Sequence, residues 1–482
     1  MESFLFKALQ LIIALVILVT VHEFGHYIFA RMFGIKVNRF YLFFNPWFSL
    51  LKYDPRKGEL QVIGYTRDED GHEVQRAWKT LRVGKPHPAA PGAKPTWRDT
   101  IYGLGWLPLG GYCDIAGMVD ETKSSKDLAA EPQPWEFRSK AAWKRLLVMV
   151  AGVLLNFVLA IIIYAGIAFH WGDRVVPYQA MTEGLDFVPE MHEAGFRDGD
   201  RLLTLNGAPL DAKDVAQRWE LVQPGARVGL LRDGDTMTVT VPPTLVKKLV
   251  SQDKSFMAMR MPVHIDKLMP GEGAILAGMQ EGDRIVAIGN DTTPSATEFY
   301  PALAANKGRH IDMTVLRDGK PVRIKNVGIN EFGKIGIQLK MPDKVFDVET
   351  KTYSLLEALP RGWEMGTDQL ATYASSLKLV FTKEGAQNLG GFGMLGSVFP
   401  DTWNWLAFWQ ITAFLSVILA FMNIIPIPAL DGGYTLFLLV EIVTRRKPSE
   451  RFLEIANMIG MGFLILLMFY ANANDIFRFL LK

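Results

Sequence analysis

The 482-residue chain has a single cysteine, Cys113, and a formal net charge of only +2. A lone cysteine cannot form an internal disulfide, so any domain outside the cytosol must be stabilised by its core alone. The balanced charge gives no support to a nucleic-acid partner, because binding to phosphates needs an excess of basic residues. Charged residues make up 21% of the chain and hydrophobic residues 49%. This mixture predicts membrane spans combined with sizeable water-facing domains.

Long apolar runs are missing from residues 172–400, which contain no stretch near the roughly 20 apolar residues that a helix needs to cross a bilayer. Four stretches elsewhere approach that length: residues 6–33, 146–169, 405–423 and 455–470. The first could also be a signal peptide, but no small-x-small cleavage site follows it, and Glu2 weakens the basic start of such a leader. We therefore predict four transmembrane helices.

Basic residues beside these stretches predict the orientation of the chain, because loops rich in lysine and arginine stay in the cytosol. They follow the first stretch, precede the second and separate the third from the fourth: Arg31, Lys36, Arg39, Arg138, Lys140, Lys144, Arg145, Arg445, Arg446, Lys447 and Arg451. We expect these loops to be cytosolic, and residues 172–400 and both termini to lie on the opposite side.

The first apolar stretch contains V-H-E-F-G-H-Y, which places His22, Glu23 and His26 toward the cytosolic end of a membrane helix. Helix positions i and i+4 share a face, so both imidazoles can bind one cation. Glu23 is offset by one residue and is suited to take a proton from water rather than to ligate the metal. Ionisable groups are costly within a membrane and indicate a functional site there, although a polar patch at the interface is the alternative.

A catalytic zinc ion needs a third protein ligand and one open position. The third apolar stretch ends in N-I-I-P-I-P-A-L-D-G-G, in which Asp431 follows two prolines. Helix-breaking residues at membrane depth are tolerated where the backbone lines protein or a water-filled cavity. The predicted orientation brings Asp431 to the depth of the histidines. Asp431 is therefore the candidate third ligand, and a helix cap just outside the bilayer is the alternative.

The pair of motifs HExxH and NxxPxPxLDGG resembles the site-2 protease family of intramembrane zinc metalloproteases, in particular its bacterial members that regulate sigma-E. Two further segments, L-P-L-G-G-Y at 107–112 and A-G-V-L-L-N-F at 151–157, resemble other motifs of the family. The resemblance implies Zn²⁺ as the cofactor and assigns six residues: Glu23 as general base, His22, His26 and Asp431 as zinc ligands, and Asn423 and Asn156 near the substrate. An interhelical hydrogen bond is the alternative role of each asparagine.

The resemblance also implies an activity and a place. It is that of a zinc endopeptidase of the bacterial inner membrane, which cuts single-span membrane proteins near the cytosolic side after another protease has trimmed their external domain. Anti-sigma factors and signal-peptide remnants are the substrates that it suggests. The chain departs from the family pattern at Val153, where a proline is usual, in a polar insertion at 54–100, in the segment 40–46 and in the glycine-rich segment 389–396. These departures leave the predicted chemistry intact and concern how the substrate is admitted.

Residues 36–46 and 101–117 are rich in aromatic and branched side chains and predict short strands. The family resemblance suggests a small sheet near the active site. A membrane helix must unwind before its peptide bonds can be cut, and a sheet edge can pair with the freed backbone groups. Cys113 is expected to be a small buried hydrophobe there.

Residues 172–345 carry an internal repeat. The segment A-G-x-x-x-G-D-R occurs at Ala194 and again at Ala277, and L-R-D-G occurs at Leu231 and again at Leu316. The two offsets, 277 − 194 = 83 and 316 − 231 = 85, are nearly equal, so we predict a duplicated domain. The pattern resembles two tandem α+β PDZ domains. Such domains bind extended peptides at a sheet edge, whereas a steric filter that excludes substrates with large external domains is the alternative.

The predicted fold is thus a polytopic α-helical membrane protein with four transmembrane helices, a small cytosolic-side β-sheet and two tandem PDZ domains. Residues 353–382 have the apolar spacing of an amphipathic helix, which can face either the membrane surface or the helical core. The expected segments are 1–34, 35–142, 143–171, 172–262, 263–345, 346–400, 401–442 and 452–482. The first, third, seventh and eighth are the membrane helices, and the fourth and fifth are the PDZ domains.

Two other functions compete with intramembrane proteolysis. A scaffold that displays the two repeats would need no general base, so Glu23 argues against it. A zinc carrier could use the same ligands, but a single HExxH site does not suggest transport. The expected partners are membrane-helix substrates, the lipid bilayer and possible peptide ligands of the PDZ domains.

Overall fold

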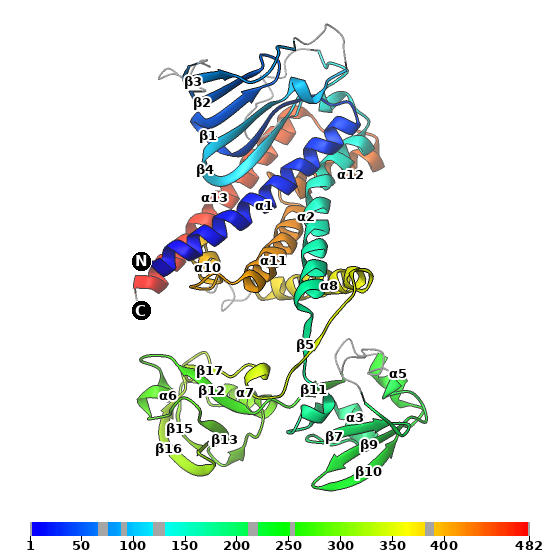
Figure 1. Ribbon diagram of the computed structural model, residues 1–482, viewed down its shortest axis with the longest axis vertical. Helices are drawn as coiled ribbons and strands as arrows, with labels where there is room; N and C mark the ends of the chain where they lie inside the picture. Colours follow the sequence, from blue (N-terminus) through cyan, green and yellow to red (C-terminus); the bar gives the residue numbers. More distant parts are fainter. Residues whose placement is uncertain are drawn as a thin grey trace. The chain divides into compact units, whose positions relative to one another are not determined.

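The computed structural model describes residues 2–65, 76–87, 94–118, 131–210, 220–250, 256–380 and 390–480. They belong to two compact units, each treated by itself below (Figure 1). The first unit combines Met1–Trp171 with Tyr353–Lys482, and the second is Gly172–Thr352. Most of the long segment without apolar runs therefore folds as a unit of its own.

Within the described residues, four helices of the first unit are long and apolar enough to cross a membrane: α1 (Glu2–Met32), α2 (Ala142–Trp171), α11 (Trp405–Ile424) and α13 (Glu450–Leu480). Four candidate membrane helices thus lie where the four spans were predicted. α2 is the central helix, because it packs against α1 and α11 and against two further helices, α8 (Leu355–Val380) and α12 (Asp431–Thr444). α13 keeps most of its apolar side chains exposed, which suits a helix surrounded by lipid.

The segment 401–442, expected to hold the third membrane helix and the LDGG motif, contains two helices separated at the helix-breaking prolines. α11 ends at Ile424, and α12 begins at Asp431. Pro426 and Pro428 lie between them, and proline provides no backbone N–H for a continuing helix. At Gly432 a Cβ atom would lie 2.1 Å from the carbonyl oxygen of Ile425, so the chain turns back closely on itself. The break places Asp431 in the first turn of a new helix.

A four-stranded sheet follows α1, in the order β3-β2-β1-β4. Its strands are β1 (Val37–Asp54), β2 (Glu59–Tyr65), β3 (Ala77–Arg82) and β4 (Ile101–Ile115). The predicted sheet is therefore present, but its two main strands are long rather than short. Residues 54–100, predicted only as a polar insertion, provide β2 and β3, which extend the sheet beyond β1. The first half of β1 pairs with both ends of β4, as in Phe40 with Cys113 and with Tyr102. The second half of β1 pairs with the start of β4, as in Tyr53 with Tyr102.

The second unit contains two successive repeats of strands and short helices. The first comprises β6 (Leu185–Phe187), α3 (Pro189–Glu193), β7 (Arg201–Leu205), β8 (Ala208–Pro209), β9 (Arg227–Arg232), β10 (Asp235–Thr240), α5 (Leu245–Val250) and β11 (Met257–Met259). The second comprises β12 (Val263–Leu268), α6 (Gly273–Leu276), β13 (Arg284–Ile288), β14 (Asp291–Thr292), α7 (Ala296–Ala305), β15 (His310–Arg317), β16 (Lys320–Gly328) and β17 (Ile337–Leu339). β5 (Asp173–Val175) and β18 (Glu349–Lys351) pair at the ends of the unit.

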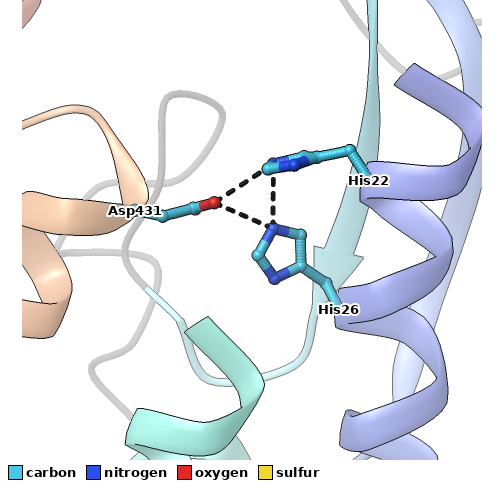
Figure 2. Close-up of side chains that lie close together, drawn as sticks. All are labelled: His22, His26 and Asp431. Carbon is cyan, nitrogen blue, oxygen red and sulfur yellow. Dashed lines mark hydrogen bonds and ion pairs between the residues drawn. The ribbon is translucent and has the colours of Figure 1, made fainter. Parts of the chain in front are cut away.

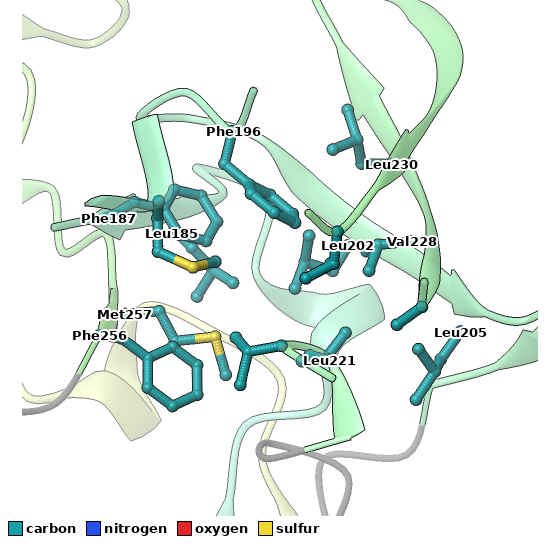
Figure 3. Close-up of a cluster of buried hydrophobic side chains, with 14 of the residues drawn as sticks. Leu185, Phe187, Phe196, Leu202, Leu205, Leu221, Val228, Leu230, Phe256 and Met257 are labelled. Carbon is teal, nitrogen blue, oxygen red and sulfur yellow. The ribbon is translucent and has the colours of Figure 1, made fainter. Parts of the chain in front are cut away.

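Each repeat has its own hydrophobic core, and that of the first is shown in Figure 3. The two repeated segments, A-G-x-x-x-G-D-R and L-R-D-G, contact each other in the same way in both repeats. Arg232 donates two hydrogen bonds of 2.7 Å to the carboxylate of Asp200, and Arg317 donates two of 2.8 Å to Asp283. Both aspartates are about 1% exposed. Each repeat therefore contains the same interaction, in which a buried carboxylate in a loop is bound by an arginine of a hairpin.

α8 packs against α2, and α10 (Phe392–Ser397) follows it. A Cβ at Gly362 would lie 2.5 Å from the backbone nitrogen of Ala165, so the two helices touch through their backbones. Leu355, Leu356 and Trp363 remain more than half exposed. The predicted amphipathic helix is thus a packing helix on one side and presents apolar side chains on the other. The first residue of the glycine-rich segment, Leu389, lies outside the described residues.

Candidate metal centre

The centre begins with two histidines on one face of α1, as their spacing predicts. His22 and His26 are both buried, and their Nε2 atoms lie 3.3 Å apart. Asp431, at the start of α12, points toward both rings from the opposite side (Figure 2). Its Oδ2 atom lies 3.1 Å from Nε2 of His22 and 3.2 Å from Nε2 of His26. The structure therefore brings the three predicted ligands together although more than 400 residues separate the histidines from the aspartate along the chain.

The spacing of the three donor atoms fits a zinc ion. In a tetrahedral site with bonds of about 2.0–2.1 Å, two donors are about 3.3–3.4 Å apart. The observed separations of 3.1 to 3.3 Å are close to that value. Oδ2 of Asp431 is buried, and neither imidazole meets it with hydrogen-bond geometry. A cation between the three atoms would satisfy this oxygen, and two imidazoles with one carboxylate form a usual zinc ligand set.

Two glycines let α1 and α2 approach each other beside the site. A Cβ at Gly25 would lie 2.6 Å from the carbonyl oxygen of Ala151. A Cβ at Gly152 would lie 2.7 Å from both Nε2 of His26 and Cε1 of His22. Any side chain at Gly152 would therefore push against the two imidazoles where they face the metal position. The sequence reveals Gly152 only as part of a motif, and its steric role could not be inferred without the helix pairing.

α2 also contacts the far nitrogen of each imidazole. Nδ1 of His26 lies 2.8 Å from the carbonyl oxygen of Val148. Nδ1 of His22 lies 3.3 Å from the side-chain nitrogen of Asn156. The carbonyl of Val148 can accept a hydrogen bond from Nδ1–H of His26, which orients that ring and leaves its Nε2 free for a metal. Val148 was not predicted, because a backbone carbonyl carries no sequence signal.

Asn423 and Glu23 lie beside the three ligand atoms without joining them. The amide nitrogen of Asn423, near the end of α11, is 3.5 Å from Nε2 of His22, on the side that faces the metal position. Glu23 lies within electrostatic reach of both histidines and Asp431, and its carboxylate interacts with the backbone of Cys113 in β4. The catalytic-base candidate is therefore adjacent to the end of the sheet. All six predicted site residues meet in one place.

Contacts farther from the ligands hold α12 in position. Arg145 of α2 forms an ion pair with Glu441 of α12, and both side chains are largely buried. Asn457 of α13 donates a hydrogen bond of 3.3 Å to the hydroxyl of Tyr434. The helix that carries Asp431 is thus anchored to both α2 and α13.

Comparisons with known proteins agree with this geometry. The model of peptidase family M50, the site-2 proteases, matches residues 10–62 and 88–467. The regulator of sigma-E protease of Haemophilus influenzae is 27% identical over 99% of this chain and all of its own length. The protein of the same name from Escherichia coli is 25% identical over the same shares. A zinc metalloprotease of Mycolicibacterium smegmatis is 24% identical over 93% of this chain and 88% of its own.

The matched family model covers most of the chain, including both helices that carry the ligands. The Mycolicibacterium smegmatis relative is named a zinc metalloprotease, in keeping with the donor set of two imidazoles and one carboxylate. This chain belongs to peptidase family M50 and is a zinc metallopeptidase.

Proposed function

We propose that the protein is an intramembrane zinc endopeptidase in which His22, His26 and Asp431 hold the metal. The observation that carries the proposal is the convergence of three ligand atoms within 3.3 Å of one another, supplied by α1 and by the helix that follows α11. α1 and α11 are both long and apolar enough to lie in a membrane. The peptide bond would therefore be cut at membrane depth.

The residues around the centre divide the chemistry among them. Bound there, Zn²⁺ supplies a Lewis acid and lowers the pKa of a water molecule. Glu23 accepts a proton from the attacking water and passes it to the leaving amide nitrogen. Asn423 lies beside the metal-facing nitrogen of His22, where its amide can donate a hydrogen bond to the substrate carbonyl oxygen.

The sheet offers a way to present an unwound substrate. Among the described strands, the end of β4 (residues 111–115) is paired with the first half of β1 only. Cys113 in this stretch contacts Glu23, so a peptide that pairs with β4 at this edge of the sheet would pass close to the base. Backbone pairing of this kind satisfies the N–H and C=O groups that a membrane helix releases on unwinding.

The substrate class follows from the relatives and remains part of the proposal. Two of them are named for the regulation of sigma-E, which favours anti-sigma factors, with signal-peptide remnants as a second group. The protein would lie in the bacterial inner membrane, with cleavage near the cytosolic side. The two repeats would be PDZ domains on the external side, where they act as a size filter or bind peptides.

The test replaces Glu23 by glutamine in the full chain, purified in detergent. Glu23→Gln should retain about one zinc per chain and lose cleavage of a single-span peptide, because only the proton acceptor is removed. Glu281→Gln, an exposed position in the second repeat, is the matched control and should keep both properties. Cleavage that survives in Glu23→Gln contradicts the mechanism. A wild-type chain that binds zinc but cuts no membrane peptide would instead support a scaffold or a carrier.

A further inference from the structure

The contact between His22 and Asn156 depends on which ring nitrogen of His22 carries the proton. Asn156 is fully buried, and its side-chain nitrogen is the atom that faces Nδ1 of His22, at 3.3 Å. Its side-chain oxygen is buried as well and has no hydrogen-bond partner among the described residues. The oxygen and nitrogen ends of a carboxamide have the same shape. Whether the neighbouring atom is a hydrogen-bond donor or acceptor therefore decides which end faces it.

A metal ion changes what His22 needs. A neutral imidazole has one N–H and one lone pair. When Nε2 gives its lone pair to a cation, the proton must be on Nδ1, which then faces Asn156 as a donor. The amide nitrogen is also a donor, so the contact as it stands would oppose two N–H groups. Nδ1 of His26 meets no such conflict, because the carbonyl oxygen of Val148 lies 2.8 Å away as a ready acceptor.

We infer that Asn156 is the positioning residue for His22, whose Nδ1–H is accepted by the carboxamide oxygen of Asn156 when Nε2 faces the metal. The inference rests on the zinc site of the proposed function. This arrangement needs a half-turn of the carboxamide, whose two ends have the same shape. Asn156 thus acts through a zinc ligand.

The backbone of Asn156 is fixed independently of this role. Ser416 of α11 donates a hydrogen bond of 2.7 Å from Oγ to the carbonyl oxygen of Asn156. The carboxamide can therefore turn while the helix that carries it stays in place. Removing the Ser416 hydroxyl changes the helix contact but leaves the acceptor for His22, which makes this position a matched control.

The experiment measures zinc affinity of the full chain in detergent, by competition with a chromogenic chelator, and needs no substrate. Asn156→Leu keeps the size of the side chain and removes the acceptor, so zinc affinity should fall about 10–100-fold, as is usual when the partner of a ligand histidine is lost. Asn156→Ala, which removes the acceptor without adding bulk, should show the same loss. Asn156→Asp supplies a permanent acceptor and should bind zinc nearly as well as the wild type. Ser416→Ala should do the same.

The outcomes separate this inference from the proposal on which it rests. Unchanged zinc affinity in Asn156→Leu and Asn156→Ala would show that Asn156 does not act through His22. An Asn156→Asp variant as weak as Asn156→Ala would show that an acceptor is not what His22 requires. Either result overturns the inference while the wild type still binds zinc. A wild-type chain without zinc affinity would overturn the zinc site itself.

Discussion

Replacing Gly152 by alanine should abolish most of the zinc affinity, because the added methyl group meets the two ligand histidines. Its Cβ would lie 2.7 Å from Nε2 of His26, whereas ordinary contacts of a Cβ begin at 3.4 Å. Restoring ordinary contact requires a movement of 3.4 − 2.7 = 0.7 Å. Metal–ligand distances tolerate only about 0.2 Å, so the rings cannot move this far and still share one ion with Asp431. We expect a loss of zinc affinity of at least about 100-fold, the upper end of what indirect perturbations of zinc ligands cause.

The assay is chelator competition on the full chain, with the melting temperature measured in excess chelator to separate folding from binding. Gly166→Ala is the matched control, because it lies on the same helix and its Cβ would have no neighbour within 4 Å. That variant should bind zinc normally and be slightly more stable, by about 0.5–1 kcal/mol, since alanine favours a helix over glycine. Wild-type zinc affinity in Gly152→Ala would refute the close approach of α2 to the metal position.

Two further predictions concern stability. In the second repeat, burial opposes ionisation of Asp283, but the bonds from Arg317 and the backbone still hold its pKa below the usual value of 3.8. The ionised carboxylate therefore stabilises the fold above about pH 5, and this contribution is lost as the pH falls through the lowered pKa. A fluorescent label in the second repeat should report a lower melting temperature below pH 4. Asp283→Asn should melt at a lower temperature than the wild type at every pH. A wild-type melting temperature that does not change with pH would contradict this. Arg145→Met should destabilise the chain by about 3–5 kcal/mol, because Glu441 is left buried and unpaired. Adding Glu441→Leu should restore much of this loss. Equal melting temperatures of the single and double variants would argue against the ion pair.

The convergence of His22, His26 and Asp431 could be predicted from the sequence because each part of the candidate site has a local pattern. HExxH places two histidines on one helix face whatever the rest of the fold, and the charge bias brings Asp431 to the same side of the membrane. The duplicated domain could be predicted for the same reason, since two short sequence segments recur at nearly equal offsets. The offsets could not predict the ion pairs of Asp200 with Arg232 and of Asp283 with Arg317. Each pair joins the two repeated segments in space.

Features that depend on backbone packing were not predictable. The two prolines indicated a break in the helix, but not that the chain would turn back closely at Gly432 and begin α12 at Asp431. The strands in the insertion were missed because β3 is almost wholly exposed and β2 is only half-buried, so hydrophobic alternation is weak there. The acceptor for His26 is a main-chain carbonyl, which any residue at position 148 would provide. The place of that carbonyl follows from how α1 and α2 meet, which no single motif specifies.

The most direct test of the centre is the zinc affinity of the Asp431→Ala variant, measured on the full chain by chelator competition and by metal content per chain. If Oδ2 of Asp431 completes the site with His22 and His26, the variant should lose most of its zinc under conditions in which the wild type retains about one ion per chain. The same affinity and metal content in both proteins would show that Asp431 is not a ligand, and would contradict the account given above.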